Sequence, residues 1–375
     1  MSKKPRITPY QLNLYSERVT DIYRALEEQV FMLLVKRLKT NPIHGKDNVL
    51  EWQIDKMQQL RILNDETIAA LSKATGLAEK EIRSAIREAG FDTIKSVDEE
   101  LSAIKDPLPI PSHIDRILET FVKQTFKELD NYVNQTLITT NYGEGTVTRM
   151  YRKIVEEVTG KVLAGTMTTN KAIAETVIRW ADKGIETTFI DRGGNRWYLE
   201  RYADTVIRST VNRTYNELRI SRMDEHGVDL VLVSSLPDPR EACSHIQGKV
   251  ASIKNPSSNP RFPSIYEFGY GEPWGLRGIN CRHLFYPFIE GLNTNNQTQF
   301  SEEDMKRNRE LSQKQRYYER QVRKAKRSLK LAEEVGDPAT IAKYKQLVRN
   351  RQAVVREFVA EHGLARRYDK ERVIV

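Results

Sequence analysis

A helical hydrophobic pattern runs through the first 226 residues and stops at Gly227, and this change constrains the fold more than any other feature. Thr8 can cap a first long amphipathic helix, with Pro9 at its first position. Further helices are predicted over residues 64–76, 77–90, 113–138, 145–164, 168–183 and 195–226. Gly76 and Gly90 are expected to close the first two of these further helices.

The stretch that follows Gly227 is rich in proline and glycine and predicts another kind of structure. Residues 228–235 form a short β-branched run, and turns and loops come after it. Helical pattern returns at Ser301, breaks at Gly336 and ends at Gly363, which predicts a helical hairpin. The expected fold class is mainly α with a small α+β domain, made of an extended helical N-terminal region, a loop-rich Cys/His domain and a C-terminal basic helical hairpin.

Three prolines between Asp106 and Pro111 interrupt the helical pattern, and Ser112 can cap the helix that follows them. A hinge is expected at this point. The chain has 375 residues, enough for two or three cores. The predicted divisions are a helical N-terminal module at 1–105, a long-helix region at 106–227, the small α+β Cys/His domain at 228–300 and the basic helical hairpin at 301–375.

Composition favours long, solvated helices over one compact globule. Charged residues make up 30% of the chain, and its mean hydropathy is -0.59. No run of eighteen apolar residues occurs, and the opening MSKKPRITPY lacks the apolar core of a signal peptide. Neither membrane insertion nor secretion is expected. We expect the protein to be synthesised and assembled in a cytoplasm.

The chain has two cysteines, Cys243 and Cys281, and each opens a Cys-x-His tripeptide that ends in His245 or His283. If both tripeptides are extended, the alternation of side chains points each Cys/His pair to one face. Two thiolates and two imidazoles suit a structural zinc ion with four protein ligands. Two alternatives stay open: buried cysteines beside hydrogen-bonded core histidines, or Cys/His nucleophilic catalysis, for which no oxyanion hole or orienting acid is visible.

The positive charge of the chain is concentrated at its C-terminal end. Residues 301–375 hold 20 Lys and Arg against 12 Asp and Glu, so they carry +8 of the chain's net +9. Such a helix can neutralise phosphates without reading bases. The alternative is pairing within the hairpin with Glu310, Glu319, Glu333 and Glu334. The predicted DNA-binding residues are Arg316, Arg320, Arg323, Lys324, Lys326, Arg327 and Lys330.

Several stretches of this chain resemble the minor capsid, or minor head, proteins of tailed double-stranded DNA bacteriophages, related to the phage Mu F-like head morphogenesis family. The resemblance is carried by CSHIQGKV, by PSIYEFGYGEPWGLRGINCRHLFYPFIEG and by QKQRYYERQVRKAKR. It is sharpest over residues 230–370, and the helical N-terminal half resembles the family in organisation.

The resemblance implies a structural virion component inside the head, near the portal and in contact with packaged DNA, that supports head assembly or DNA delivery. The implied partners are the portal protein, major capsid or scaffolding proteins and double-stranded DNA without sequence specificity, with no membrane in the assembled head. The resemblance implies that the protein is structural and is not an enzyme. Two other functions remain open: a metal-dependent nuclease or hydrolase housed in 228–300, and a nucleic-acid-binding protein that works outside any virion.

Overall fold

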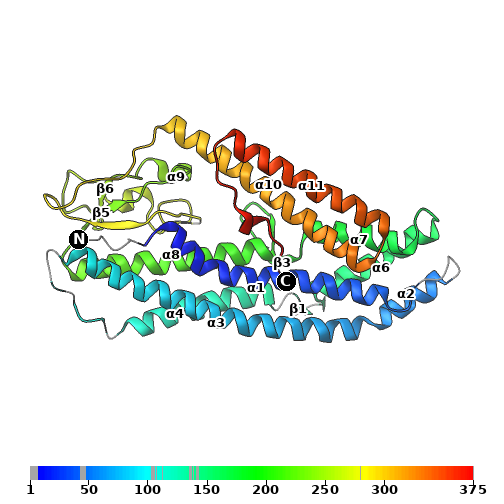
Figure 1. Ribbon diagram of the computed structural model, residues 1–375. Helices are drawn as coiled ribbons and strands as arrows, with labels where there is room; N and C mark the ends of the chain where they lie inside the picture. Colours follow the sequence, from blue (N-terminus) through cyan, green and yellow to red (C-terminus); the bar gives the residue numbers. More distant parts are fainter. Residues whose placement is uncertain are drawn as a thin grey trace. The chain divides into compact units, whose positions relative to one another are not determined.

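The computed structural model describes residues 7–42, 48–102, 106, 108–111, 113–134, 137, 139–140, 143–278 and 280–374 (Figure 1). Within these residues the chain is built mainly from long α-helices, and short strands form small antiparallel sheets. The predicted fold class, mainly α with a small α+β domain, is confirmed. The predicted C-terminal hairpin is also present, as two long helices joined at Gly336.

The helices account for most of the described residues. The α-helices are α1 (Pro9–Lys39), α2 (Val49–Gln58), α3 (Leu60–Leu101), α4 (Ile114–Leu129), α6 (Thr146–Leu163), α7 (Thr169–Lys183), α8 (Leu199–Glu225), α9 (Glu241–Ser244), α10 (Glu302–Val335) and α11 (Pro338–Glu361). A π-helix, η1 (Asp130–Asn134), follows α4, and η2 (Ile265–Phe268) and η3 (Tyr368–Glu371) are short 3-10 helices.

The strands are short and pair only antiparallel. They are β1 (Thr139–Thr140), β2 (Gly143–Glu144), β3 (Glu186–Ile190), β4 (Arg196–Tyr198), β5 (Leu230–Val233), β6 (Val250–Ser252) and β7 (Phe285–Phe288). β1 pairs with β2 and β3 with β4, and the third sheet has the order β6-β5-β7.

The chain forms two compact units, each assembled from three separate segments. The first unit consists of Met1–Thr20, Glu79–Glu128 and Asp204–Ser312, and the second of Asp21–Ala78, Leu129–Ala203 and Gln313–Val375. The sequence predicts four divisions that follow one another along the chain, whereas each of these units combines separate segments. The four divisions therefore stay a prediction. Residue 107 of the expected hinge lies outside the described residues. So does Ser112, the predicted cap of the helix that follows the hinge.

The prediction that Gly76 and Gly90 each end a helix is wrong, because both lie inside the continuous helix α3. A glycine inside a helix costs roughly 1 kcal/mol relative to alanine, which packing of the whole helix can outweigh. Gly90 also has a packing role. A Cβ atom on Gly90 would lie 2.5 Å from Cδ2 of the buried Leu118, so α4 approaches α3 closely there. A Cβ on Gly76 would meet nothing within 4 Å.

The predicted helix over 195–226 begins later than expected, because its first residues belong to a β-hairpin in the second unit. β3 and β4 pair with Ile190 opposite Arg196, and Asp191 organises the turn between them. Its Oδ1 accepts hydrogen bonds from the backbone N–H groups of Gly193 and Asn195, both at 2.9 Å. Such local side-chain bonding favours a turn over a helix.

The core of the first unit forms around β5, whose four residues are all buried. In the register of the sheet, Leu232 lies opposite Val250 of β6 and Tyr286 of β7. The same hydrophobic cluster includes Val97 from α3 and Met223 from α8. The β-branched run predicted as a strand is therefore the central strand of the small sheet, as its continuous apolar character suggests.

Replacing Gly90 by valine should lower the free energy of unfolding by about 1–3 kcal/mol, because the added methyl groups must displace Leu118 and Leu218. The matched control is Gly76→Val in the same helix, where the space is open and the change should be neutral or slightly stabilising. Urea unfolding of the two variants measures the difference. Equal midpoints for the two variants would contradict the packing role of Gly90.

Candidate functional site

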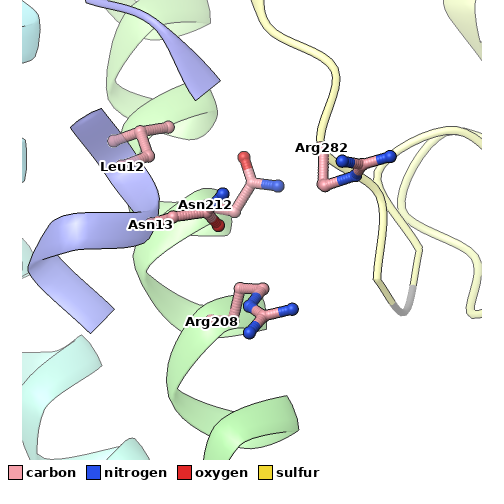
Figure 2. Close-up of a pocket in the computed structure, with 5 residues that line it drawn as sticks. All are labelled: Leu12, Asn13, Arg208, Asn212 and Arg282. Carbon is pink, nitrogen blue, oxygen red and sulfur yellow. The ribbon is translucent and has the colours of Figure 1, made fainter. Parts of the chain in front are cut away.

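A small pocket in the first unit is lined by Leu12, Asn13, Arg208, Asn212 and Arg282. Figure 2 shows Arg208 and Asn212 on neighbouring turns of α8 and Arg282 on a loop beside them. Both arginines are engaged: Arg208 with Asp204 and Arg282 with Asp238, at 2.7 and 2.8 Å. The pocket lining holds no carboxylate, histidine or thiol, so it offers no group for acid–base or nucleophilic chemistry.

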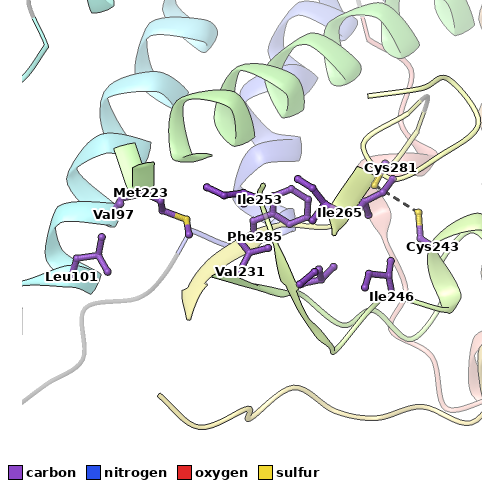
Figure 3. Packing of buried hydrophobic residues seen from close by; sticks show 13 residues of the cluster. Val97, Leu101, Met223, Val231, Cys243, Ile246, Ile253, Ile265, Cys281 and Phe285 are labelled. Atoms are coloured by element: carbon purple, nitrogen blue, oxygen red, sulfur yellow. Dashed lines mark hydrogen bonds between the residues drawn. The ribbon is translucent and has the colours of Figure 1, made fainter. Parts of the chain in front are cut away.

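The two cysteines lie together in the same unit. Their sulfur atoms are 3.8 Å apart, and Figure 3 shows Cys243 and Cys281 approaching each other from separate segments. Sγ of Cys281 lies 3.6 Å from Nδ1 of His283. The three potential ligand atoms all lie within 4.8 Å of one another, and the three residues are buried. The sequence expectation that both cysteines and His283 meet is thus matched by the geometry.

His245 is not part of this cluster. The condition that both tripeptides be extended is not met by the first one, because Cys243 lies in the helical turn α9 and His245 is its C-cap. Residues two apart in a helical turn point to different sides, so burial of Cys243 leaves His245 exposed. The geometry therefore brings together three of the four predicted metal ligands.

The backbone around the cysteines is shaped by a glycine-rich loop. A Cβ on Gly275 would lie 2.2 Å from the carbonyl oxygen of Gly269, and one on Gly278 would lie equally close to that of Glu272. Only glycine permits such backbone approaches. Gly278 also accepts a hydrogen bond from the N–H of Cys281, which holds the second cysteine at the end of this loop.

The pKa values of the two thiols are shifted in opposite directions. The hydrogen bond with Cys243 holds the pKa of the Cys281 thiol well below its ordinary value, and His283 acts in the same direction. The pKa of the Cys243 thiol is raised by the same hydrogen bond and by burial. Arg240 limits this rise, because its Nη2 lies 3.5 Å from the sulfur of Cys243.

The C-terminal hairpin is the second candidate site. α10 and α11 pack against each other through Tyr318 and Phe358, whose ring centroids are 5.2 Å apart. The segment after α11 returns to α10, where Arg367 forms two hydrogen bonds with Glu319 at 2.8 and 2.9 Å. Gln315 donates to the carbonyl oxygen of Ala365 at 2.9 Å.

The seven predicted DNA-binding residues have different environments. Arg327 is buried and donates to Glu28, and Glu27 lies 3.7 Å from its guanidinium. Arg323 donates to Glu200 at 2.7 Å. Arg320 and Lys324 are exposed, whereas the others are partly exposed: Arg316, Lys326 and Lys330.

Arg323 and Arg327 pair with acids outside the hairpin, namely Glu200, Glu27 and Glu28. Glu319 binds Arg367, and Glu333 lies 3.8 Å from Lys345. Burial would raise the pKa of Glu200, but Arg323 and Arg24 outweigh this effect and hold it below its ordinary value. Burial raises the pKa of both Glu27 and Glu28 against the influence of Arg327. Arg323 and Arg327 therefore stabilise the second unit from inside.

A second set of bases, on α11, was not singled out from the sequence. Lys345, Arg349 and Arg356 are exposed, and their spacing of four and seven residues places them on one helix face, called here the α11 basic face. No Asp or Glu occurs between Asp337 and Glu357. That acid-free run is the sequence signal that could have identified this face.

Comparison with known proteins assigns the class. The family model for phage minor capsid protein 2 matches residues 7–360, so the chain belongs to this family of phage minor capsid proteins and is a structural component of the virion. The resemblance stated from the sequence is confirmed. Among the described residues, none of the helices combines the length and the apolar character that crossing a bilayer requires.

Two relatives come from phages of Lactococcus. A structural protein of Lactococcus phage LL-H is 35% identical over 362 residues, which cover 94% of this chain and 98% of that protein. A structural protein of Lactococcus phage mv4 is 44% identical over 120 residues, covering 32% of this chain and 98% of that protein. No solved structure matches the chain.

Replacing Arg327 by methionine should lower the free energy of unfolding by about 3–5 kcal/mol near neutral pH, because two buried carboxylates lose their cation. Arg320→Met is the matched control. It removes the same charge from an exposed position on the same helix, and it should change stability by about 0.5 kcal/mol or less. Thermal and urea unfolding measure both effects.

Acidification should partly restore the Arg327→Met variant. Without the cation, the raised pKa values of Glu27 and Glu28 rise further above those of the unfolded chain. The folded variant then binds more protons than the unfolded one, so its stability falls as pH rises through this range. The deficit against the unsubstituted protein should therefore shrink between about pH 7 and about pH 5. A deficit that is constant or grows on acidification would contradict this account.

Proposed function

We propose that this chain is a non-enzymatic minor capsid protein that lies inside the phage head near the portal, contacts packaged DNA without reading its sequence and supports head assembly or DNA delivery. It would be synthesised in the host cytoplasm, with the portal and the capsid or scaffolding proteins as its partners. Family membership supports the virion role. The proximity to the portal rests on the resemblance of the sequence to minor head proteins.

The observation that carries the DNA contact is the α11 basic face. Of its three residues, only Lys345 has an acidic partner in the described part of the chain. That partner, Glu333, lies 3.8 Å away, and both side chains are about half exposed. Such an exposed ion pair contributes little to stability, so it holds Lys345 only weakly. Exposed bases along a helix bind phosphates by releasing counterions.

The DNA surface proposed here differs in part from the one read from the sequence. Arg323 and Arg327 serve internal ion pairs, so they are not proposed as DNA ligands. Arg320 and Lys324 remain candidates because both are exposed. The five exposed bases present no recognised base-reading motif, which favours contact with the DNA backbone only.

The full-length protein should bind duplexes of unrelated sequence with similar affinity, and a plot of log K against log salt should be steep. Replacing Lys345, Arg349 and Arg356 by glutamine should reduce that slope by about 3, at about 0.9 for each lost phosphate contact. The control variant replaces three exposed bases of the first unit, Lys80, Arg116 and Lys123, and removes the same total charge.

Two outcomes of this experiment would overturn the proposal. Absence of binding at low salt, or an equal loss in both triple variants, would exclude the α11 basic face as the DNA surface. Cleavage of the duplex in the presence of divalent metal ions, abolished by His283→Ala, would replace the structural function by an enzymatic one.

Location in the head can be tested on intact particles. Acetylation of lysines in DNA-filled heads and in empty procapsids should show Lys345 protected only where DNA is packaged. Lys80, which is exposed on α3, serves as the internal control and should react equally in both particles. Absence of the protein from purified heads, or equal acetylation of Lys345 in both particles, would contradict an interior position against DNA.

A further inference from the structure

The cluster of Cys243, Cys281 and His283 has the composition of a metal site. It combines two sulfur atoms and one imidazole nitrogen, the ligand types that bind zinc through sulfur and nitrogen. The ligands come from two segments that are far apart in sequence, the turn α9 and the loop that precedes β7. All three residues are at most 4% exposed.

Hydrogen bonds determine which nitrogen of His283 is available. Oε1 of Gln247 accepts the backbone N–H of Leu236 at 3.0 Å, so this end of the Gln247 side chain is its oxygen. The same oxygen lies 3.1 Å from Nε2 of His283. An oxygen accepts only, so Nε2 must carry the proton. In the neutral ring, Nδ1 then carries the lone pair, and it faces the sulfur of Cys281.

This arrangement matches the second contact that metal-bound histidines make. A histidine ligand commonly donates its other ring N–H to an oxygen, which sets both its tautomer and its orientation. Gln247 is itself buried and held at its other end, where its Nε2 lies 2.8 Å from the sulfur of Met305. His283 is therefore oriented before any ion arrives.

Two of the three spacings between ligand atoms match those of a zinc site, and the third, between Cys243 and His283, is at most 4.8 Å. With Zn–S at about 2.3 Å and Zn–N at about 2.0–2.1 Å, tetrahedral geometry separates two sulfurs by about 3.8 Å and sulfur from nitrogen by about 3.6 Å. The distances here are 3.8 Å between the sulfurs and 3.6 Å from Cys281 to His283. A disulfide needs a separation of about 2.05 Å, so the sulfurs are too far apart to be bonded.

We propose that Cys243, Cys281 and His283 bind one zinc ion through their two Sγ atoms and through Nδ1, with a small exogenous ligand such as water in the fourth position. Binding displaces thiol protons to the solvent and leaves a centre of two thiolates and one neutral imidazole. The guanidinium of Arg240 donates to the sulfur of Cys243 and to the carbonyl oxygen of Gly275, and so ties this ligand to the glycine-rich loop. The ion links two segments of the loop-rich region, the turn α9 and the loop before β7.

This inference differs from the four-ligand site expected from the sequence, because it excludes His245. It is independent of the proposed DNA contact, which uses other residues. Either can fail without the other.

The test uses the full-length protein purified without chelator and under reducing conditions. Elemental analysis should find about one equivalent of zinc, and cobalt(II) exchanged into the site should show sulfur-to-metal charge-transfer absorption. Cys281→Ser and His283→Ala should lose the metal. His245→Ala is the matched control from the same tripeptide pattern and should retain a full equivalent.

Gln247→Leu keeps all three ligands and removes the hydrogen bond that orients His283, together with the contacts to Leu236 and Met305. Metal content and circular dichroism measured on the same sample distinguish weaker metal binding from a general loss of folding. Gln247→Leu should weaken metal affinity by about 10-fold to 100-fold while circular dichroism keeps its helical signal. Wild-type protein with less than about a tenth of an equivalent of metal and no cobalt spectrum would overturn the proposal. So would a mass lower by two hydrogens, which would show a Cys243–Cys281 disulfide instead, or equal metal loss in His245→Ala.

Discussion

Buried arginine–carboxylate pairs set the register of the long helices inside each unit. In the first unit, Arg219 and Arg222 of α8 are buried, and they bind Glu100 and Asp98 of α3. In the second unit, Arg327 of α10 binds the acids of α1. Apolar faces alone tolerate a slip of one helix along another, but a buried charge without its partner costs several kcal/mol. A different alignment of these helices would leave such charges buried without a partner. The ion pairs therefore favour one way of packing the helices.

The parts of the fold that depend on local pattern could be predicted from the sequence. Periodicity shows the long helices, and the continuous apolar run of β5 shows a buried strand. Distant contacts decide the rest. Nothing near Gly90 in the sequence indicates that Leu118 lies against it. Likewise, the Cys-x-His spacing does not show that Cys243 lies in the helical turn α9. In that turn, the side chains of Cys243 and His245 point to different sides.

Charge illustrates the same limit more sharply. A count of basic residues shows that the C-terminal segment is positively charged. It does not show which of these residues form ion pairs inside the protein. Arg327 and Arg320 lie seven residues apart on one helix, yet one is buried between glutamates and the other is exposed. The α11 basic face could have been read from the absence of acids around it, because bases without neighbouring acids cannot be neutralised locally.

The interleaving of the two units affects how the protein is made. Neither unit is a continuous piece of chain, so neither can be completed as an early product of translation. Glu28 and its partner Arg327 are 299 residues apart, which corresponds to about 15–60 s of synthesis at about 5–20 residues per second. During that interval the glutamates of α1 stay hydrated. The nascent chain must therefore delay burying this part of α1 until α10 has left the ribosome, so closure of the second core waits for the synthesis of α10.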